Sequence, residues 1–114
     1  MPRRDPRVRL LHMRDYARKA LDMAAGQSRS DLDSDEKLRY ALTHLVEVIG
    51  EAASQVPSEV QQTHGEIPWP QVISMRHRLI HGYDSVDYSL LWATITESLP
   101  GLLDGLNRIL GPEE

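Results

Sequence analysis

The sequence predicts an all-α protein, an antiparallel bundle of four or five helices. The main observation is an apolar stripe whose residues are separated alternately by four and three positions, as on one face of a helix. Its members are Leu38, Leu42, Leu45, Ile49, Ala52 and Val56. A second observation is the aromatic content of only 5%, without any Phe, which leaves an aliphatic core better suited to packed helices than to a sheet. We find no alternating pattern long enough to predict a strand.

Length and composition indicate one domain, residues 1–114, with a single hydrophobic core. Hydrophobic residues make up 40% and charged residues 26%, as in ordinary globular proteins. The chain has no Cys, which excludes disulfides and thiolate chemistry. No stretch approaches the roughly 20 apolar residues that a membrane span needs, so we expect a soluble, cytoplasmic protein without a membrane partner. The net charge of −4 means that any contact with RNA must be made by a local basic patch.

The first helix is expected from Asp5 to about Gly26, with Asp5 as N-cap and Pro6 in its first turn. Its apolar stripe consists of Leu10, Met13, Ala17, Leu21 and Ala24. Its other faces carry Arg7, Arg9, Arg14, Arg18 and Lys19. These basic residues could steer RNA, but a solvated helix face is the favoured interpretation.

The second helix is expected to start at Ser34, a candidate N-cap that follows a polar break over residues 26–31, and to end at Pro57. The small residues Gly50, Ala52 and Ala53 would let a neighbouring backbone approach this helix closely. A short helix over residues 58–64 follows.

The next helix is expected from about Pro70 to His81, with Gly82 as the residue that stops it in a left-handed turn. Residues 83–87 predict a turn, and Asp87 is a candidate cap for the last helix. In that helix, residues 100–101 (Pro-Gly) predict a kink or a division into two shorter helices.

Residues 75–83 combine groups that can carry charge or donate strong hydrogen bonds with apolar neighbours that would fix the backbone. The polar members are Arg76, His77, Arg78, His81 and Tyr83. An arginine that is always charged, near a histidine that titrates close to neutral pH, is the minimal equipment for chemistry on a phosphodiester. Arg76 and His81 are separated by about 140° on an ideal helix. They can act together only if the helix loosens at His81 or a second copy of the chain completes the site.

The reaction that suits this pair is cleavage of RNA by its own 2′-hydroxyl. His81 would take the proton from that hydroxyl or deliver one to the leaving 5′-oxygen. Arg76 would hold the phosphate and stabilise the charge of the transition state, and Tyr83 would lie near the same phosphate. This reaction needs no metal ion or other cofactor, and it spares DNA.

Each of these residues also has a structural interpretation. Arg76 could form an ion pair with an acidic residue on another helix, His81 could be favoured by the dipole at a helix end, and Tyr83 could be a half-buried turn residue. His77 and His81 are four positions apart and could bind zinc, although no Glu stands beside the first His as in the protease motif. A third ligand would have to come from His44, Glu47 or Glu51.

The pattern of Arg76, four residues, and then His81-Gly82-Tyr83 resembles the R-x4-H-x-Y signature of HepT-like toxins, which belong to the HEPN superfamily of helical ribonucleases. Residues 45–52 are similar to the second-helix segment of that family, and Trp69 and residues 87–92 also match its pattern. The resemblance covers most of the chain from about residue 38 to residue 103. One departure is His77, because the family usually carries Asn after the motif arginine.

This resemblance implies an HEPN-like homodimer with a composite cleft and a metal-independent endoribonuclease acting as a toxin. Arg76 and His81 would be catalytic, with His77, Arg78, Tyr83 and Glu51 supporting the site or binding substrate. The implied partner is an MNT-type minimal nucleotidyltransferase antitoxin that transfers AMP to the motif tyrosine, Tyr83 by position. The alternative is a non-catalytic helical dimer that uses the same cleft to bind a nucleotide or a partner nucleotidyltransferase.

Overall fold

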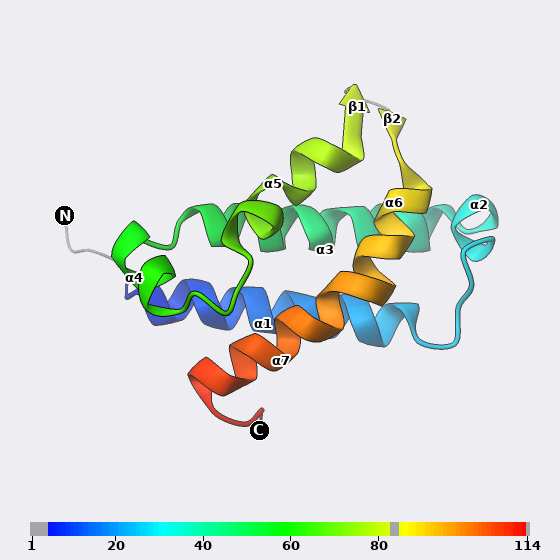
Figure 1. The fold of residues 1–114 in the computed structure, drawn as a ribbon. Helices are drawn as coiled ribbons and strands as arrows, with labels where there is room; N and C mark the ends of the chain where they lie inside the picture. Colours follow the sequence, from blue (N-terminus) through cyan, green and yellow to red (C-terminus); the bar gives the residue numbers. More distant parts are fainter. Residues whose placement is uncertain (1–4, 83–84, 114) are drawn as a thin grey trace.

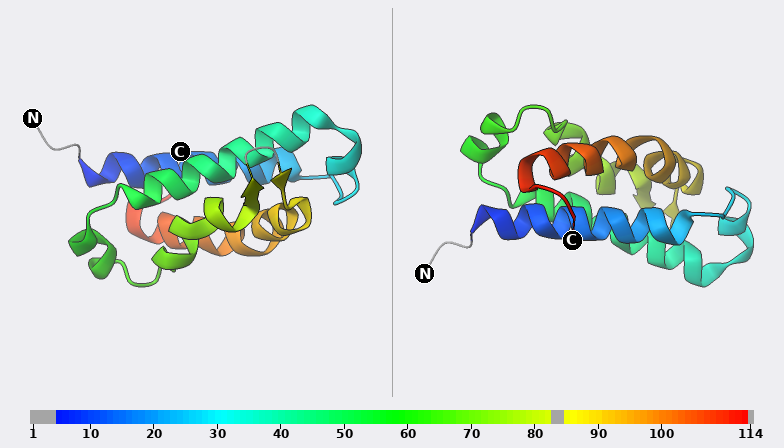
Figure 2. Two further views of the ribbon diagram at one scale, coloured as in Figure 1. Left: turned by 90° about the horizontal axis from the view of Figure 1, so that it is seen from above. Right: turned by 90° about the horizontal axis from the view of Figure 1, so that it is seen from below.

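The helices of the protein are arranged in two layers, as seen in a computed structural model that describes residues 5–82 and 85–113 (Figure 1). Tyr83 and the side chain of His81 lie outside the described part. The helices are α1 (Pro6–Ala24), α2 (Asp31–Ser34), α3 (Glu36–Ser54), α4 (Ser58–Thr63), α5 (Trp69–Leu79), α6 (Tyr88–Ala93), η1 (Thr94–Ser98) and α7 (Leu99–Leu110). Antiparallel α1 and α3 form one layer, and α5 with the rod of α6, η1 and α7 forms the other (Figure 2). The predicted all-α class is confirmed.

The core between the layers is aliphatic, as the composition predicts. Every residue of the α3 stripe is at least nine-tenths buried. The largest fully buried side chains are Met13, Leu32, Leu42, Val46, Ile49, Val72, Leu79, Leu91, Ile95, Leu99 and Leu106. They come from both layers, so the contact between the layers holds the bundle together. In the described ranges, no helix is both long and apolar enough to cross a membrane.

The predicted close approach at Gly50 is confirmed, and the neighbour is α5. A Cβ atom built on Gly50 would lie 3.2 Å from the carbonyl oxygen of Val72 and 3.9 Å from the amide nitrogen of Arg76. Because the contact involves backbone atoms, a side chain at this position would push α5 away from α3. Gly50 therefore sets the distance between the two helices that carry the candidate site.

The start of α3 differs from the prediction by one residue. Asp35 is its N-cap, and Asp35 Oδ1 accepts a hydrogen bond from Leu38 N at 3.1 Å. Ser34 is instead the last residue of the short helix α2, which lies at the end of the predicted polar break. Ser and Asp are equally good N-caps, and the carboxylate is the one that reaches the free amide.

The end of α5 also differs from the prediction, because the helix stops at Leu79 and not at Gly82. Residues Ile80–Gly82 form a short strand, β1, that pairs antiparallel with β2 (Ser85–Val86). Asp87 N donates to Leu79 O at 2.9 Å and closes the ribbon. The expectation that the chain contains no strand is therefore wrong for these five residues, although their ribbon is too small to change the fold class.

The predicted interruption of the last helix is confirmed, but it lies before the Pro-Gly pair. The segment Thr94–Ser98 is a π-helix, in which Leu99 N donates to Thr94 O, five residues back. Pro100 follows in the first turn of α7. A proline has no amide hydrogen and crowds the carbonyl four residues earlier, which explains the wider turn. Asp87 caps α6 as predicted, with its Oδ1 accepting from Leu90 N at 2.9 Å.

The basic residues of α1 lie at the surface, as the sequence favoured, but three of its arginines also contact the end of α7. Arg14 Nη1 donates to Gly111 O at 2.7 Å and to Asn107 Oδ1 at 3.2 Å. Arg7 Nη2 donates to Leu110 O at 3.4 Å, and Arg18 contacts Glu113. Arg7 and Arg14 thus bind backbone carbonyls at the C-terminus of α7, which a helix leaves unpaired. Together with the side-chain contacts of Arg14 and Arg18, these bonds fasten α7 to α1.

Candidate active site

The last turn of α5 presents three consecutive basic residues, Arg76, His77 and Arg78, all of them exposed. The start of the helix is fixed by Trp69, which is 5% exposed and whose indole Nε1 donates to His64 O at 3.0 Å. Its buried side continues through Met75 to the end of the helix. Positive charge is favoured at a helix C-terminus, so the fold itself supports a cationic end here.

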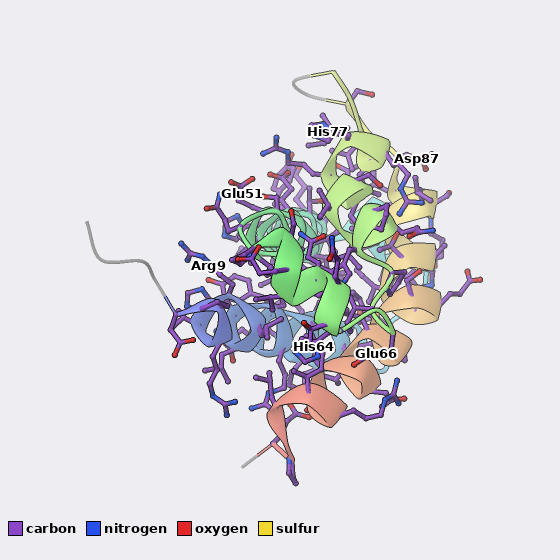
Figure 3. All side chains as sticks on the ribbon, turned by 60° about the vertical axis from the view of Figure 1, so that its left-hand side comes forward. Arg9, Glu51, His64, Glu66, His77 and Asp87 are labelled. Carbon is purple, nitrogen blue, oxygen red and sulfur yellow. The ribbon has the colours of Figure 1, made fainter. Side chains whose placement is uncertain are left out.

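A small hollow of about 200 Å³ lies where this basic turn meets α3. Its lining residues are Gly50, Glu51, Ser54, Ile73, Arg76 and His77. We call it the α3–α5 hollow. Its volume is below the range of about 300–1,000 Å³ that is usual for small-molecule pockets, and it suits a phosphate group better than a whole nucleoside. The structure thus brings together Arg76, His77 and Glu51, three of the residues expected at the site. Figure 3 labels Glu51 on α3 and His77 on α5.

Glu51 is the acidic neighbour of Arg76, with Glu51 Oε2 at 3.7 Å from Arg76 Nη1. The structural interpretation of Arg76, an ion pair with another helix, is therefore present in the molecule. The two side chains are 44% and 58% exposed. An ion pair in such contact with solvent contributes at most about 1 kcal/mol, so a phosphate can compete for the guanidinium.

The backbone at His81 is extended and irregular, whereas the sequence predicted the end of a helix. Ile80 pairs with Val86 and Gly82 pairs with Ser85, so β1 has one residue more than β2 between these pairs. That extra residue is His81. Bulges of this kind redirect a side chain and are common beside active sites. The helix therefore loosens before His81, which is one of the two ways in which His81 could act with Arg76, but the positions of the His81 and Tyr83 side chains stay predictions.

One described residue that was expected at the site, Arg78, does not line the α3–α5 hollow. Arg78 lies on the other flank of α5, and its Nη2 donates to Gln71 O at 3.2 Å. Among the described side chains, no group of three or more His, Asp or Glu residues is placed to hold a metal ion. His77 and Glu51 line the α3–α5 hollow, without a third such ligand in its described lining.

Two lining residues, Ser54 and Ile73, were not expected at the site. Ser54 follows Gly50 by four positions and therefore shares its face of α3. Its hydroxyl donates to Glu51 O at 2.6 Å. The spacing could have identified Ser54, whereas the sequence does not distinguish Ile73 from the other apolar residues of its helix.

Comparisons with known proteins agree with the motif. A family model described as "Ribonuclease HepT-like" matches residues 13–109. A protein of Caldanaerobacter subterraneus subsp. tengcongensis named "Putative RNase" is 33% identical over 109 residues, which cover 96% of this chain and 97% of that protein. The "Probable ribonuclease HepT" of Thermococcus cleftensis is 40% identical over 72 residues, 63% of this chain and 66% of that protein. No solved structure matches the chain significantly.

The helical fold, the basic turn and these matches define a ribonuclease of the HEPN superfamily. Within that class, the chain belongs to the ribonuclease HepT-like family, whose model covers most of its length. The resemblance inferred from Arg76, His81 and Tyr83 is thereby confirmed at the level of the family.

Proposed function

We propose that the chain is a metal-independent endoribonuclease toxin of an HEPN/MNT toxin–antitoxin pair, and that residues 1–114 act as one HEPN-like domain in the cytoplasm. The observation that carries the proposal is the exposed basic turn of α5 beside the α3–α5 hollow. Family membership makes RNA the substrate. Arg76 is the residue that holds the phosphate, because its guanidinium can donate two parallel hydrogen bonds to it.

The reaction is a transesterification within the RNA. The 2′-oxygen attacks phosphorus, a bond between them forms, and the bond from phosphorus to the 5′-oxygen breaks. His81 takes the proton of the 2′-hydroxyl or gives one to the 5′-oxygen. Arg76 stabilises the extra negative charge on the phosphoryl oxygens. The products carry a 2′,3′-cyclic phosphate and a free 5′-hydroxyl, and DNA is not cut because it lacks the attacking group.

The complete site is proposed to form between two copies of the chain. One subunit offers a single Arg76 and a shallow hollow of about 200 Å³, which is too small to enclose an RNA strand. A two-fold axis beside the end of α5 doubles the arginines and histidines around one cleft. It also focuses positive potential on an otherwise acidic body.

Tyr83 is proposed as the control point. The partner antitoxin, an MNT-type nucleotidyltransferase, would transfer AMP from ATP to Tyr83, with a bond from the tyrosine oxygen to the α-phosphorus and release of pyrophosphate. The added nucleotide is bulky and anionic, so it would block the RNA site near Arg76 by volume and by charge. Mass spectrometry of the chain co-expressed with such a partner tests this step, and an unmodified Tyr83 contradicts it.

The test of the main proposal is RNA cleavage by the purified protein in the presence of a chelator. The wild type should release 2′,3′-cyclic phosphate ends from RNA and leave DNA of the same sequence intact. His81→Ala should abolish cleavage while the circular dichroism spectrum and unfolding midpoint stay the same. Retained cleavage by His81→Ala, or loss of wild-type cleavage with chelator, overturns the mechanism.

The ion pair between Arg76 and Glu51 favours a second function, a non-catalytic dimer that binds a nucleotide or a nucleotidyltransferase. A guanidinium already paired at 3.7 Å can serve recognition alone. If the wild type leaves RNA intact but binds nucleotide, and Arg76→Met weakens that binding, this second function is the correct one.

A further inference from the structure

A second hollow of about 380 Å³ lies on the opposite flank of α5, between α5 and α7. We call it the α5–α7 hollow. The residues that matter for its chemistry are Glu66, Gln71, Met75, Arg78, Gly101 and Leu102. It is almost twice as large as the α3–α5 hollow and falls within the usual range of small-molecule pockets, about 300–1,000 Å³. It can therefore accept a group of the size of a nucleobase.

The lining of this hollow is apolar at its floor and polar at its rim. Met75 and Leu102 are 3% and 4% exposed and form part of the floor. A flat ring gains from such a surface, and the thioether of Met75 adds a favourable contact with an aromatic face. At the rim, Arg78 and Glu66 contribute opposite charges. Figure 3 shows Glu66 in the segment that precedes α5, well away from His77 at the other end of the helix.

Both charged groups at the rim retain hydrogen-bonding capacity. Arg78 uses Nη2 for its bond to Gln71 O at 3.2 Å, and a guanidinium has five N–H donors. Glu66 Oε1 lies 4.0 Å from His64 Nδ1, which is longer than a hydrogen bond. The rim can therefore offer a single ligand both the guanidinium donors of Arg78 and the carboxylate acceptor of Glu66.

We propose that the α5–α7 hollow binds a guanine base of the RNA substrate, a step that rests on the ribonuclease function proposed above. Guanine has acceptors at O6 and N7, which suit the two-pronged donor of Arg78. It also has the N1–H and N2–H donors, which suit the carboxylate of Glu66. Adenine and the pyrimidines lack one or both of these sets, so the pair of charges selects guanine.

The position of this hollow relative to the basic turn explains how one strand reaches both. Successive residues on a helix are turned by about 100°. From Arg76, the exposed face of α5 passes through His77 and Ser74 to Arg78. A strand that crosses this face would have its phosphate at Arg76 and its base on the far flank, roughly one helix width or about 10 Å away. The guanosine would therefore lie at a fixed offset from the cleaved linkage.

The experiment uses RNA oligonucleotides with one guanosine at varied positions, incubated with the full chain. Cuts should follow the guanosine at a constant offset. Replacing it with 7-deazaguanosine, which lacks N7, or with inosine, which lacks the 2-amino group, should each slow the cut by roughly tenfold. Arg78→Met should remove the penalty of the 7-deaza analogue alone, and Glu66→Ala the penalty of inosine alone.

Gly101 supplies a variant that fills the hollow. A Cβ at Gly101 meets nothing within 4 Å, so Gly101→Phe should fold and occupy the space, whereas the matched control Gly101→Ala should leave it open. Gly101→Phe should remove the preference for guanosine and Gly101→Ala should keep it. The proposal is overturned if the cut positions do not depend on guanosine, or if the analogue penalties persist in Arg78→Met and Glu66→Ala. Either result leaves the ribonuclease function intact.

A direct binding measurement separates failure of the proposed guanine site from failure of the proposed ribonuclease function. If RNA is not cut at all, the binding of GMP and AMP is measured by calorimetry on the wild type and Gly101→Phe. Tighter binding of GMP that Gly101→Phe abolishes supports the guanine site while the ribonuclease function fails. Equal or absent binding of the two nucleotides overturns the guanine site as well.

Discussion

The C-terminal ends of α5 and α7 both have arginines around them, yet the two groups of arginines have different roles. At the end of α7, Arg7, Arg14 and Arg18 bind backbone carbonyls, Asn107 and Glu113. At the end of α5, Arg76 and Arg78 project into solvent beside two hollows.

The difference between the two ends is one of geometry and not of composition. An arginine on a neighbouring helix can aim its donors at the last carbonyls of α7 and satisfy them. An arginine in the last turn of its own helix points away from most of those carbonyls, so its charge stays available to an external anion. The first arrangement stabilises the fold, and the second leaves positive charge exposed for the phosphate that we propose to bind there.

The largest expected effect is on catalysis at the α5 end. Arg76→Met should lower the rate of RNA cleavage about 100-fold or more, because the variant loses the charge that stabilises the transition state. The free energy of unfolding should change by less than about 1 kcal/mol, since the lost ion pair is exposed. Single-turnover cleavage and denaturant unfolding measure the two quantities.

The matched control breaks the same ion pair from its other side. Glu51→Gln removes the partner but keeps the guanidinium, so cleavage should persist and RNA should bind as tightly as before or more tightly. If Glu51→Gln loses activity as severely as Arg76→Met, the ion pair itself is required and the assignment of Arg76 as phosphate ligand is wrong.

At the α7 end the expected effect is on stability. Arg14→Met should lower the free energy of unfolding by about 1.5–3 kcal/mol, the usual contribution of hydrogen bonds from a charged donor. It leaves the Gly111 and Asn107 oxygens without their donor. Cleavage per folded molecule should equal that of the wild type. Arg9→Met, on the same helix but without a hydrogen bond in the described part of the chain, is the control and should change neither quantity.

The sequence predicted those features of the fold that depend on local spacing. The buried stripe of α3, the Asp5 and Asp87 caps and the close approach at Gly50 all follow from residue type and position. The ribbon after Leu79 was missed because its strands are two and three residues long and depend on pairing between them, which gives no periodic signal.

The candidate site was predictable to a similar extent. The cluster of polar residues over 75–83 identified Arg76 and His77 directly, and the structure places both in one hollow with Glu51. The role of Arg14 was not predictable, because its partners lie 93 and 97 positions away in the sequence. The hollow beside Arg78 was likewise not predictable, because residues of α7 form part of its lining. Tertiary contacts of this kind leave no pattern in the local sequence.

A smaller effect is expected where the fold positions the α5 end. Gly50→Ala should lower the free energy of unfolding by about 1 kcal/mol, because its methyl group would lie 3.2 Å from Val72 O and push α5 outward. Cleavage should fall several-fold as Arg76 moves with α5. Gly101→Ala, in open space, should instead stabilise the protein by up to about 1 kcal/mol. A stabilised Gly50→Ala variant with full activity contradicts this explanation of the helix spacing.

The smallest effect concerns Glu113 at the α7 end. Its hydrogen bond with Arg18 holds the pKa of the Glu113 carboxyl below its ordinary value of 4.5. A carboxyl whose pKa is lower in the folded state adds stability above the unfolded pKa and loses it as the pH falls through the folded pKa. Glu113→Gln should therefore be slightly less stable than the wild type at pH 7. The difference should shrink below about pH 4.5 and vanish in stronger acid, as thermal unfolding across that range will measure.

High salt should also reduce the stability difference between Glu113→Gln and the wild type, because the pair of Glu113 and Arg18 is exposed. A difference that grows in acid would mean that Glu113 is held by something other than Arg18.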